Sequence, residues 1–366
     1  MQRSIGYAAL VTMLLALLWG GAARGQAFAP YAIQIISLPS APLNYAQGIN
    51  NNGIAVGAVD SGGALRDEFL RAAIYANGGV SGAGVLVGYI GTYDYAINDA
   101  GQSVGWAIAD LGLFPGPTLT HAVLFVHDSA QDLGALVRGG NSTAYAINVW
   151  GVAAGSSDTA APNGPGHAAL FTFANHTVND LGLPTGDQAS VAYAINGYGQ
   201  VVGSSIDTGG VEHAVRFVPG PPTRLGALPG DTYSQARGLN DLGQAVGYSA
   251  SLRTPSHAVM FAGGQVIDLG LYPGGTHSAA VAINNLGQAV GTGDTGDGGF
   301  DHALLFQNGQ VVDLGKLPGG QGSAANGIND RGDIVGSADN ADGLECAVEW
   351  TLAHQAIGPL KPLAAE

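Results

Sequence analysis

Five histidines recur at the same position of a short phrase, and imidazole is a common ligand of metals in proteins. The phrase reads HAVLF, HAALF, HAVRF, HAVMF and HALLF, and its histidines are His121, His167, His213, His257 and His302. Copies that are related by a repeat are expected to lie too far apart to share one zinc ion, whose ligands sit within about 2.1 Å of the metal. We therefore predict a structural hydrogen bond inside each repeat, and a ring of imidazoles around a central channel is the alternative.

Aspartates of a second phrase are the expected partners of these histidines. The tripeptide DLG follows most copies of the histidine phrase and supplies Asp132, Asp180, Asp268 and Asp313. A carboxylate that accepts hydrogen bonds from nearby backbone N–H groups stabilises a turn. Catalysis needs one asymmetric constellation, so a residue that recurs in each repeat is expected to be structural.

Two loops contain aspartates at spacings that resemble calcium-binding loops. They are DTGDGGFD (294–301) and DNADGLE (339–345), and the candidate ligands are Asp294, Asp297, Asp301, Asp339 and Asp342. Calcium takes six to eight oxygen ligands, and neither loop has the spacing of an EF-hand. Calcium is thus the one cofactor that the sequence indicates, and an Asx turn is the alternative for both loops.

Charged and aromatic residues that interrupt the repeat are the other candidates for function. The stretch 61–71 (SGGALRDEFLR) gathers Arg66, Asp67, Glu68 and Arg71, and we predict either a binding loop for a polar ligand or a solvated loop. Further charges that break the repeat are Arg138, Arg216, Arg237 and Glu349, and aromatics that offer stacking surfaces include Trp106, Trp150 and Tyr198. The sequence contains no nucleophile-elbow, zinc-protease, P-loop or dinucleotide-binding motif in a fitting context.

A third phrase defines the elements that must position these residues. It reads AIN-x-x-G-x-x-VG with small variations, and its asparagines, which follow one another at intervals of 44 to 50 residues, are Asn50, Asn98, Asn148, Asn196, Asn240, Asn284 and Asn329. Asn and Gly tolerate left-handed backbone angles, so each copy predicts a turn between two short strands. The histidine phrase and the DLG phrase predict a second hairpin. Four strands per repeat indicate a seven-bladed β-propeller of four-stranded blades, with a β-solenoid as the alternative.

The two ends of the chain are expected to close the ring and to direct export. Residues 31–38 (YAIQIISL) are a candidate closing strand, which would remove a free sheet edge. Residues 1–27 have the basic start, short apolar core and small residues of a signal peptide, and 363–366 are a short tail after a single repeat domain at 28–362. We therefore expect a secreted or periplasmic protein with no membrane span after the signal is removed.

Composition excludes several classes of protein. The 366 residues include 60 glycines, 46% are hydrophobic and 11% are charged, which fits neither a disordered chain nor collagen. The net charge of −15 makes nucleic acid an unsuitable partner. Cys346 is the single cysteine, so no disulfide can form within the chain, and it replaces the repeat histidine, where we expect it to pack.

Together the three phrases resemble the bacterial extracellular HAF-repeat family across residues 31–360. The third residue of the histidine phrase is never Phe here, and the first and last repeats carry Arg71 and Cys346 in place of histidine. The resemblance implies secretion and a repeat architecture, and it implies no catalytic residue. Our leading hypothesis is a monomeric, non-catalytic scaffold that binds an extracellular protein or glycan. The alternatives are a polysaccharide lyase or glycoside hydrolase built on a propeller, and a calcium-stabilised structural module.

Overall fold

The computed structural model describes residues 31–37, 43–60, 70–109, 119–127, 129–160 and 164–352. Almost all regular structure in these ranges is β-strand, and the exception is a short 3-10 helix, η1 (Phe173–Asn175). No helix in the described ranges has the length and apolar character needed to cross a bilayer. The expected signal peptide (1–27) and the tail (363–366) lie outside the described residues.

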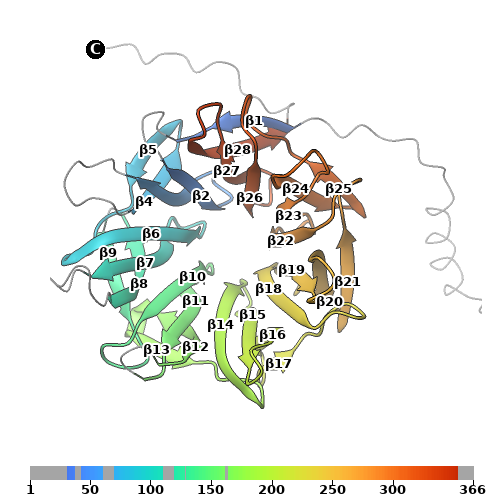
Figure 1. Ribbon diagram of the computed structural model, residues 1–366. Helices are drawn as coiled ribbons and strands as arrows, with labels where there is room; N and C mark the ends of the chain where they lie inside the picture. The colour runs from blue at the N-terminus through green and yellow to red at the C-terminus, as the bar shows by residue number, and fades with distance from the viewer. Residues whose placement is uncertain are drawn as a thin grey trace, which may run out of the picture. The chain divides into compact units, whose positions relative to one another are not determined.

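Twenty-eight strands form seven separate four-stranded antiparallel sheets, which follow one another around a ring (Figure 1). One strand of each sheet ends directly before the repeat asparagine and lies nearest the centre. These strands are β2 (Asn44–Ile49), β6 (Tyr89–Ile97), β10 (Ser142–Ile147), β14 (Asp187–Ile195), β18 (Tyr233–Leu239), β22 (Ser278–Ile283) and β26 (Ser323–Ile328). The second strands follow the Asn-x-x-Gly turn: β3 (Ala55–Asp60), β7 (Ser103–Ala109), β11 (Val152–Asp158), β15 (Val201–Asp207), β19 (Ala245–Ala250), β23 (Ala289–Gly293) and β27 (Ile334–Asp339).

The histidine phrase and the DLG phrase form the outer half of each blade. The third strands are β4 (Leu70–Ala76), β8 (Leu119–Val126), β12 (Gly166–Thr172), β16 (Glu212–Val218), β20 (His257–Ala262), β24 (His302–Gln307) and β28 (Glu345–Leu352). The outermost strands are β5 (Gly79–Gly82), β9 (Ser129–Gly134), β13 (Thr177–Asp180), β17 (Thr223–Arg224), β21 (Gln265–Gly270), β25 (Gln310–Asp313) and, from the start of the chain, β1 (Tyr31–Ile35). The predicted seven-bladed propeller of four-stranded blades is confirmed, and separate sheets in a ring exclude the β-solenoid.

The fourth blade illustrates why the asparagine phrase folds as a hairpin. The Asn196 side-chain oxygen accepts hydrogen bonds from the backbone N–H groups of Tyr198 (3.1 Å) and Gln200 (2.9 Å). Gly199 completes the turn at φ +74°, a conformation that L-residues with a side chain rarely adopt. A Cβ atom at Gly203 would overlap the carbonyl oxygen of Val191 on the innermost strand, so the second glycine allows the two strands to approach closely.

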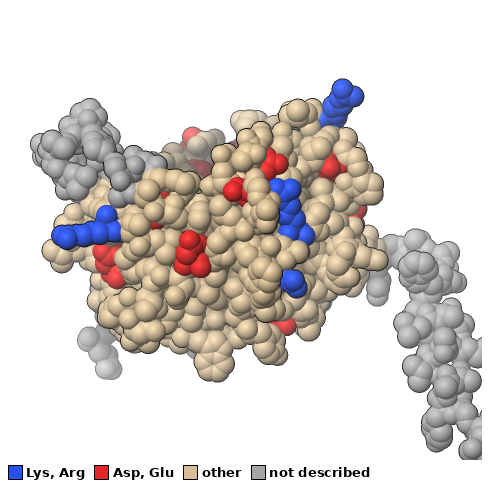
Figure 2. Space-filling model, turned by 90° about the horizontal axis from the view of Figure 1, so that it is seen from below, with Lys and Arg blue, Asp and Glu red and all other residues tan. Residues whose placement is uncertain are grey.

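The hydrophobic core lies between neighbouring blades. The aromatic residue that ends the histidine phrase is buried in each blade, and the set comprises Tyr75, Phe125, Phe171, Phe217, Phe261, Phe306 and Trp350. One such cluster joins Phe171 of the third blade with Val104 and Ala122 of the second blade. Many apolar residues are thus buried between blades. The side of the ring in Figure 2 carries scattered charged side chains on an otherwise uncharged surface.

A strand from the start of the chain completes the last blade. β1 pairs antiparallel with β28, with Tyr31 opposite Leu352 and Ile35 opposite Val348 (Figure 1). Tyr31 and Ile33 pack against the core cluster that contains the fully buried Trp350. The predicted closing strand is therefore present, although its regular pairing covers residues 31–35 of the expected 31–38.

Candidate functional site

The repeat histidines form hydrogen bonds within their own blades. Nδ1 of His121 lies 2.7 Å from a carboxylate oxygen of Asp132. The same pairing holds in three further blades: His167 with Asp180 at 2.9 Å, His257 with Asp268 at 3.0 Å and His302 with Asp313 at 2.9 Å. The other oxygen of Asp132 accepts a bond from the backbone N–H of Gly134 (2.7 Å). Each DLG aspartate thus joins the histidine of one strand to the turn that ends the next.

The fourth blade replaces the DLG aspartate with Arg224 and uses different partners. His213 instead pairs through Nε2 with Asp207 at 3.1 Å. Arg224 forms an ion pair with the Asp187 carboxylate, which also accepts a hydrogen bond from Ser205. The histidines therefore act as structural side chains even where the repeat sequence changes. Among the described residues, no three His, Cys, Asp or Glu side chains are placed to hold a metal ion together.

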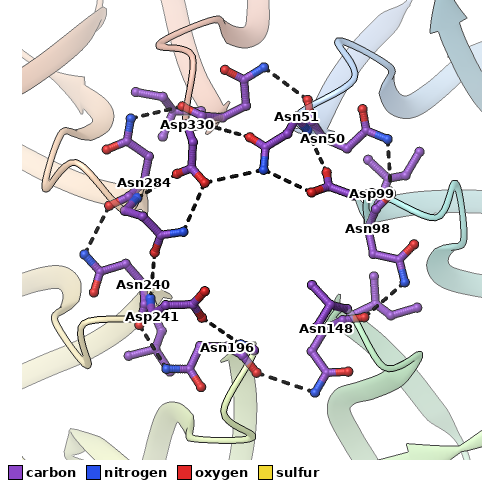
Figure 3. A pocket seen from close by; sticks show the side chains of 18 of the residues that line it. Asn50, Asn51, Asn98, Asp99, Asn148, Asn196, Asn240, Asp241, Asn284 and Asp330 are labelled. Carbon is purple, nitrogen blue, oxygen red and sulfur yellow. Dashed lines mark hydrogen bonds between the residues drawn. The ribbon is translucent and has the colours of Figure 1, made fainter.

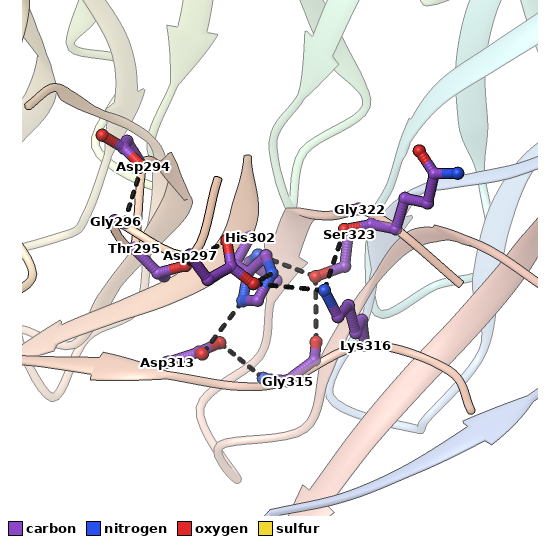
Figure 4. A network of polar contacts seen from close by, with 12 residues as sticks. Asp294, Thr295, Gly296, Asp297, His302, Asp313, Gly315, Lys316, Gly322 and Ser323 are labelled. Atoms are coloured by element: carbon purple, nitrogen blue, oxygen red, sulfur yellow. Dashed lines mark hydrogen bonds and ion pairs between the residues drawn. The ribbon is translucent and has the colours of Figure 1, made fainter. Parts of the chain in front are cut away.

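Four of the five calcium candidates have carboxylates that contact protein donors, and Figure 4 shows two of them, Asp294 and Asp297. Asp294 accepts bonds from the Gly296 backbone N–H (2.7 Å) and the Thr276 hydroxyl (2.8 Å), and these bonds, that from Gly296 foremost, lower its pKa. The other candidates form separate contacts: Asp297 with Lys316 at 3.2 Å, Asp301 with His277 at 2.8 Å, Asp339 with the Gln321 N–H at 2.7 Å, and Asp342 through its own N–H with Asn340 at 2.9 Å. Two of these contacts, from the Gly296 N–H to Asp294 and from the Asp342 N–H to Asn340, have the pattern of an Asx turn, and calcium binding stays a prediction.

The charged stretch 61–71 is described only at its end. Arg66, Asp67 and Glu68 lie outside the described residues, while Arg71 lies on β4 opposite Val59 of β3. The proposed binding loop therefore has one described member, which is a strand residue of the first blade.

The seven repeat asparagines form a closed ring of hydrogen bonds around the centre of the propeller (Figure 3). Each side-chain Nδ2 donates to the backbone carbonyl of the next blade's asparagine, at distances from 2.9 Å for Asn196 to Asn240 up to 3.5 Å for Asn148 to Asn196. The last bond runs from Asn329 to Asn50 at 3.1 Å. All seven side chains are buried, so their polar atoms are satisfied within the protein.

This ring surrounds a central pocket of about 190 Å³ that opens between the turns. We call this side of the ring the Asn-turn face, and its turns are 50–53, 98–101, 148–151, 196–199, 240–243, 284–287 and 329–332. The pocket is also lined by one aliphatic residue from each blade, namely Ile49, Ile97, Ile147, Ile195, Leu239, Ile283 and Ile328. Its charged lining residues in the described chain are Asp99, Asp241 and Asp330, and no cation lines it.

A second polar network joins the residues that follow the asparagines, and it is interrupted in two blades. The Asn51 N–H donates to Asp99 (2.8 Å), and the Asp330 N–H donates to the Asn51 side chain (2.9 Å). The same link joins Gly197 to Asp241, Asp241 to Asn285 and Asn285 to Asp330, each at 2.8 Å. The third and fourth blades carry Val149 and Gly197 at this position. Val149 has an aliphatic side chain and Gly197 has none, so neither residue offers a side-chain acceptor for the hydrogen bond that would close the network.

Exposed apolar side chains lie at this interruption and continue over the next blades. Trp150 is 76% exposed and Tyr198 is 79% exposed, and the Trp150 indole N–H donates to the Gly197 carbonyl at 2.9 Å. Val149, Leu242 and Leu286 are also exposed. We refer to these five residues as the apolar arc. Two of the aromatics expected to offer stacking surfaces, Trp150 and Tyr198, thus lie in turns whose neighbouring residues line the pocket.

A different set of aromatics lines the centre of the ring three residues before the asparagines. Tyr95, Tyr145 and Tyr193, here called the tyrosine arc, belong to consecutive innermost strands, with ring centroids 5.1 Å and 5.4 Å apart. Equivalent positions of adjacent blades touch only near the axis. The Arg237 guanidinium, in the next blade, lies 5.1 Å from the Tyr193 ring centroid. Trp106 extends the set, because it stacks on Tyr93 and donates a hydrogen bond to the Tyr95 hydroxyl at 3.3 Å.

Polar side chains hold the arginine end of the tyrosine arc. The Arg237 Nε donates to the side-chain oxygen of Gln235, whose amide donates to Glu212 at 2.6 Å. Glu212 also accepts bonds from the Ser204 hydroxyl (2.6 Å) and the Tyr248 hydroxyl (3.2 Å). Burial raises the pKa of Tyr145 and, with the charge of Glu212, that of Tyr248 to about 12. These phenols are therefore neutral near pH 7 and serve as hydrogen-bonding groups.

Departures from the repeat pattern point to some of these residues one at a time and not to the sets that they form. Arg237 stands out in the sequence because it interrupts the repeat, whereas Tyr95, Tyr145 and Tyr193 do not stand out. Alignment of the copies on the asparagine would place all four at the third residue before it. The same alignment reveals a Ser or Thr six residues before the asparagine in every copy except the first, which has Asn44. One example is Ser190, which accepts a bond from the Ala168 N–H of the previous blade at 2.9 Å.

No family model and no curated protein matches the chain. Among solved structures, the β-propeller domain of the Trilobed protease from Pyrococcus furiosus is similar at 10% identity, with a TM-score of 0.52 over 84% of this chain and 95% of that chain. That domain has an open velcro topology, whereas here β1 pairs with β28.

Two further similar structures are a puromycin-hydrolyzing peptidase and a puromycin hydrolase. A puromycin-hydrolyzing peptidase from Mycobacterium tuberculosis matches at 10% identity and a TM-score of 0.57, over 92% of this chain and 57% of that chain. A mutant puromycin hydrolase matches at 13% identity and a TM-score of 0.51, over 85% and 52% of the two chains. This chain spans little more than half the length of these two chains. At such identities the likeness shows the β-propeller fold alone.

Proposed function

We propose that this propeller is a non-catalytic binding protein that docks a partner protein on its Asn-turn face. The observation that carries the proposal is the apolar arc, which lies on the turns around the central pocket. Soluble monomers seldom leave neighbouring large apolar side chains exposed unless the surface binds something. Tryptophan and tyrosine are also the residues that contribute most to the affinity of protein interfaces.

A protein fits this surface better than a glycan does. Sugars stack on aromatic rings, but Val149, Leu242 and Leu286 offer aliphatic surface that a hydrated polyol gains little from covering. The Trp150 indole is already fixed by its bond to the Gly197 carbonyl, so little side-chain entropy is lost when a partner covers it.

The aspartates around the pocket restrict the charge that the partner surface can carry. Asp99, Asp241 and Asp330 surround the pocket, and no described Lys, Arg or His lines it. The partner surface is therefore apolar over the arc and neutral or basic over the pocket, since like charges would repel it. If the expected signal peptide directs export, this partner is extracellular or periplasmic.

Site-specific photocrosslinking tests the proposal. A benzophenone amino acid is placed at Leu286, in the apolar arc, or at Leu252, which is exposed near the opposite ends of the strands. Each protein is incubated with the culture medium and cell envelope of the producing organism and irradiated. We expect a protein adduct from position 286 that is missing from position 252.

The identified partner is then titrated against the wild type, Trp150→Ala and Leu252→Ala. We expect at least a tenfold loss of affinity for Trp150→Ala, as for a central interface aromatic, and no loss for Leu252→Ala. The proposal fails if position 286 gives no adduct of its own, if the adduct joins two copies of this chain, or if both variants bind the partner equally well.

A further inference from the structure

The tyrosine arc and Arg237 lie at a level of the central channel that solvent reaches. The seven equivalent positions, three residues before the asparagines, are Gln47, Tyr95, Tyr145, Tyr193, Arg237, Val281 and Asn326. Arg237 is exposed, and the other six are partly exposed although they belong to the innermost strands. Three blades contribute a phenol and the others contribute two amides, a guanidinium and an aliphatic side chain. The repeat is therefore broken in a way that makes this part of the channel asymmetric.

Arg237 differs from the cations that the fold uses for structure. Arg224, Lys316 and Arg331 each form an ion pair with an aspartate. Within the described ranges no carboxylate lies at ion-pair distance from Arg237, which contacts Gln235 and the Tyr193 ring. In a chain with a net charge of −15, this leaves a guanidinium with free N–H donors inside the channel.

The residues around Arg237 hold it in place without neutralising it. Gln235 is buried, accepts the Arg237 Nε–H and donates its amide to Glu212. Glu212 is in turn occupied by the Ser204 and Tyr248 hydroxyls. The Tyr193 ring stacks below the guanidinium. An arginine supported on one edge and one face presents its remaining edge to a ligand, and planar carboxylates suit that edge.

The tyrosine arc provides the surface beside this cation. Its three rings are tilted by 50° and 57° to one another, so their faces do not form one flat stack. Next to them, the Gln47 amide donates to the Tyr93 hydroxyl at 2.7 Å. Aromatic faces mixed with neutral donors and acceptors match a pyranose ring, which has an apolar C–H face and a rim of hydroxyls. The sixth blade offers only Val281 at this level, a smaller side chain than the tyrosines opposite.

We propose that the central channel binds a carboxylate-bearing saccharide, such as a uronic acid unit of an acidic glycan. Its carboxylate pairs with the free edge of the Arg237 guanidinium, and its ring lies against Tyr193 and Tyr145. The hydroxyls of the sugar reach the phenol groups of the arc. This site is distinct from the Asn-turn face and takes a second ligand, so it stands independently of the proposed protein partner.

Calorimetric titration with defined oligosaccharides tests the inference. The probes are tetragalacturonate and a neutral galactose tetramer of the same length, each titrated up to 10 mM into the wild-type protein. We expect tetragalacturonate to bind at least tenfold more tightly than the neutral tetramer. Arg237→Gln should lose this preference because it removes the positive charge. Arg237→Lys should retain part of it, because the lysine ammonium keeps the charge but lacks the planar pair of N–H donors of the guanidinium. Tyr145→Leu should weaken both probes.

Arg216→Gln is the matched control, because Arg216 is exposed on β16 of the neighbouring blade. Circular dichroism and the melting temperature verify that each variant is folded. If Arg237→Gln does not fold, Arg237→Lys takes its place in the titration. The inference is overturned if neither probe binds, if both bind alike, or if Arg216→Gln has the same effect as Arg237→Gln. Equal binding of a short peptide acid would replace the saccharide with a peptide carboxylate. Trp150→Ala leaves this titration unchanged, which separates it from the test of the protein partner.

Discussion

The Asn329 side chain donates a hydrogen bond to the backbone carbonyl of Asn50, 3.1 Å away and 279 residues earlier in the chain. This bond joins the seventh blade to the first and closes the ring of amides around the axis. The same two blades also meet where Asn326 donates to the Ala46 carbonyl at 2.9 Å. Closure therefore depends on polar contacts at the centre as well as on the pairing of β1 with β28 at the rim.

The amide ring predicts that Asn240→Asp destabilises the propeller. The carboxylate keeps the two acceptor contacts of the local turn, with the N–H groups of Leu242 and Gln244. It loses both donated bonds, to the Asn284 carbonyl and the Gln244 side chain. Buried acceptors left without a donor cost about 1–3 kcal/mol. Urea denaturation should show a loss of this size at pH 7.

Asn340→Asp is the control for this prediction. Asn340 forms the same local turn, with bonds to the N–H groups of Asp342 and Leu344, but it lies in an outer loop away from the amide ring. We expect its unfolding free energy to change little. Equal losses in the two variants would mean that the local turn, not the bond between blades, accounts for the effect.

A buried carboxylate in the second blade predicts an unusual dependence of stability on pH. Asp94 is 0% exposed, and the equivalent residue of other blades is alanine, as in Ala144 and Ala192. Burial raises its pKa well above the ordinary range, and the 2.5 Å bond from Ser103 opposes this only in part. The folded protein therefore holds a proton that the unfolded chain releases. Stability should fall as the pH rises from about 4 toward the folded pKa.

Asp94→Ala should remove this dependence. We expect the variant to melt at a higher temperature than the wild type at pH 8 and to show a smaller difference at pH 4. Thermal denaturation at both pH values measures the effect. A wild-type advantage at pH 8 would contradict the assignment of Asp94 as a neutral buried acid.

The DLG aspartates predict a pH dependence of stability with the opposite sign to that of Asp94. Burial opposes the ionisation of Asp132, but the bonds from His121 and the Gly134 N–H outweigh it and lower the pKa of Asp132. Its contribution to stability is therefore present above the unfolded pKa of about 3.9 and is lost as the pH falls through the folded value. Asp132→Asn should lower the melting temperature at pH 7, and the difference from the wild type should shrink below pH 3. A difference that does not depend on pH would contradict this.

Much of the architecture was predictable because the repeat fixes local structure seven times. The Asn-x-x-Gly turn follows from Asn196 and Gly199 alone, and the hydrogen bond of His121 to Asp132 follows from the fixed order of their phrases. The order of strands across a blade was not predictable, because each strand alternates between small and large residues and several orders would bury them. The amide ring was missed for the same reason, since it exists only when Asn196 and its equivalents lie near the axis.

The candidate sites were predictable only as departures from the repeat. Trp150, Tyr198 and Arg237 stand out in sequence because their types differ from those of equivalent residues. The places of these residues in the fold do not stand out in the sequence, because the sequence around a turn tip is no different in kind from the sequence around a channel position. Trp150 lies at a turn, while Arg237 lies three residues before the asparagine. Only the closed ring of blades places Trp150 on the turns around the pocket and Arg237 within the channel. The resemblance to HAF-repeat proteins stays a prediction.

The closing strand gives the last prediction, that Ile33→Asp opens the seventh blade. Ile33 pairs with Trp350 and packs on the core cluster that contains this fully buried indole. An aspartate there places a charge against apolar surface and removes a packed aliphatic side chain, for a loss of roughly 2 kcal/mol or more. Once β1 detaches, β28 becomes an exposed sheet edge, which favours association between molecules. Urea denaturation should show the loss, and light scattering should show aggregation at temperatures where the wild type stays monodisperse. Ala32→Asp adds the same charge at an exposed position of the same strand, so equal behaviour of the two variants would contradict the role of Ile33 in closure.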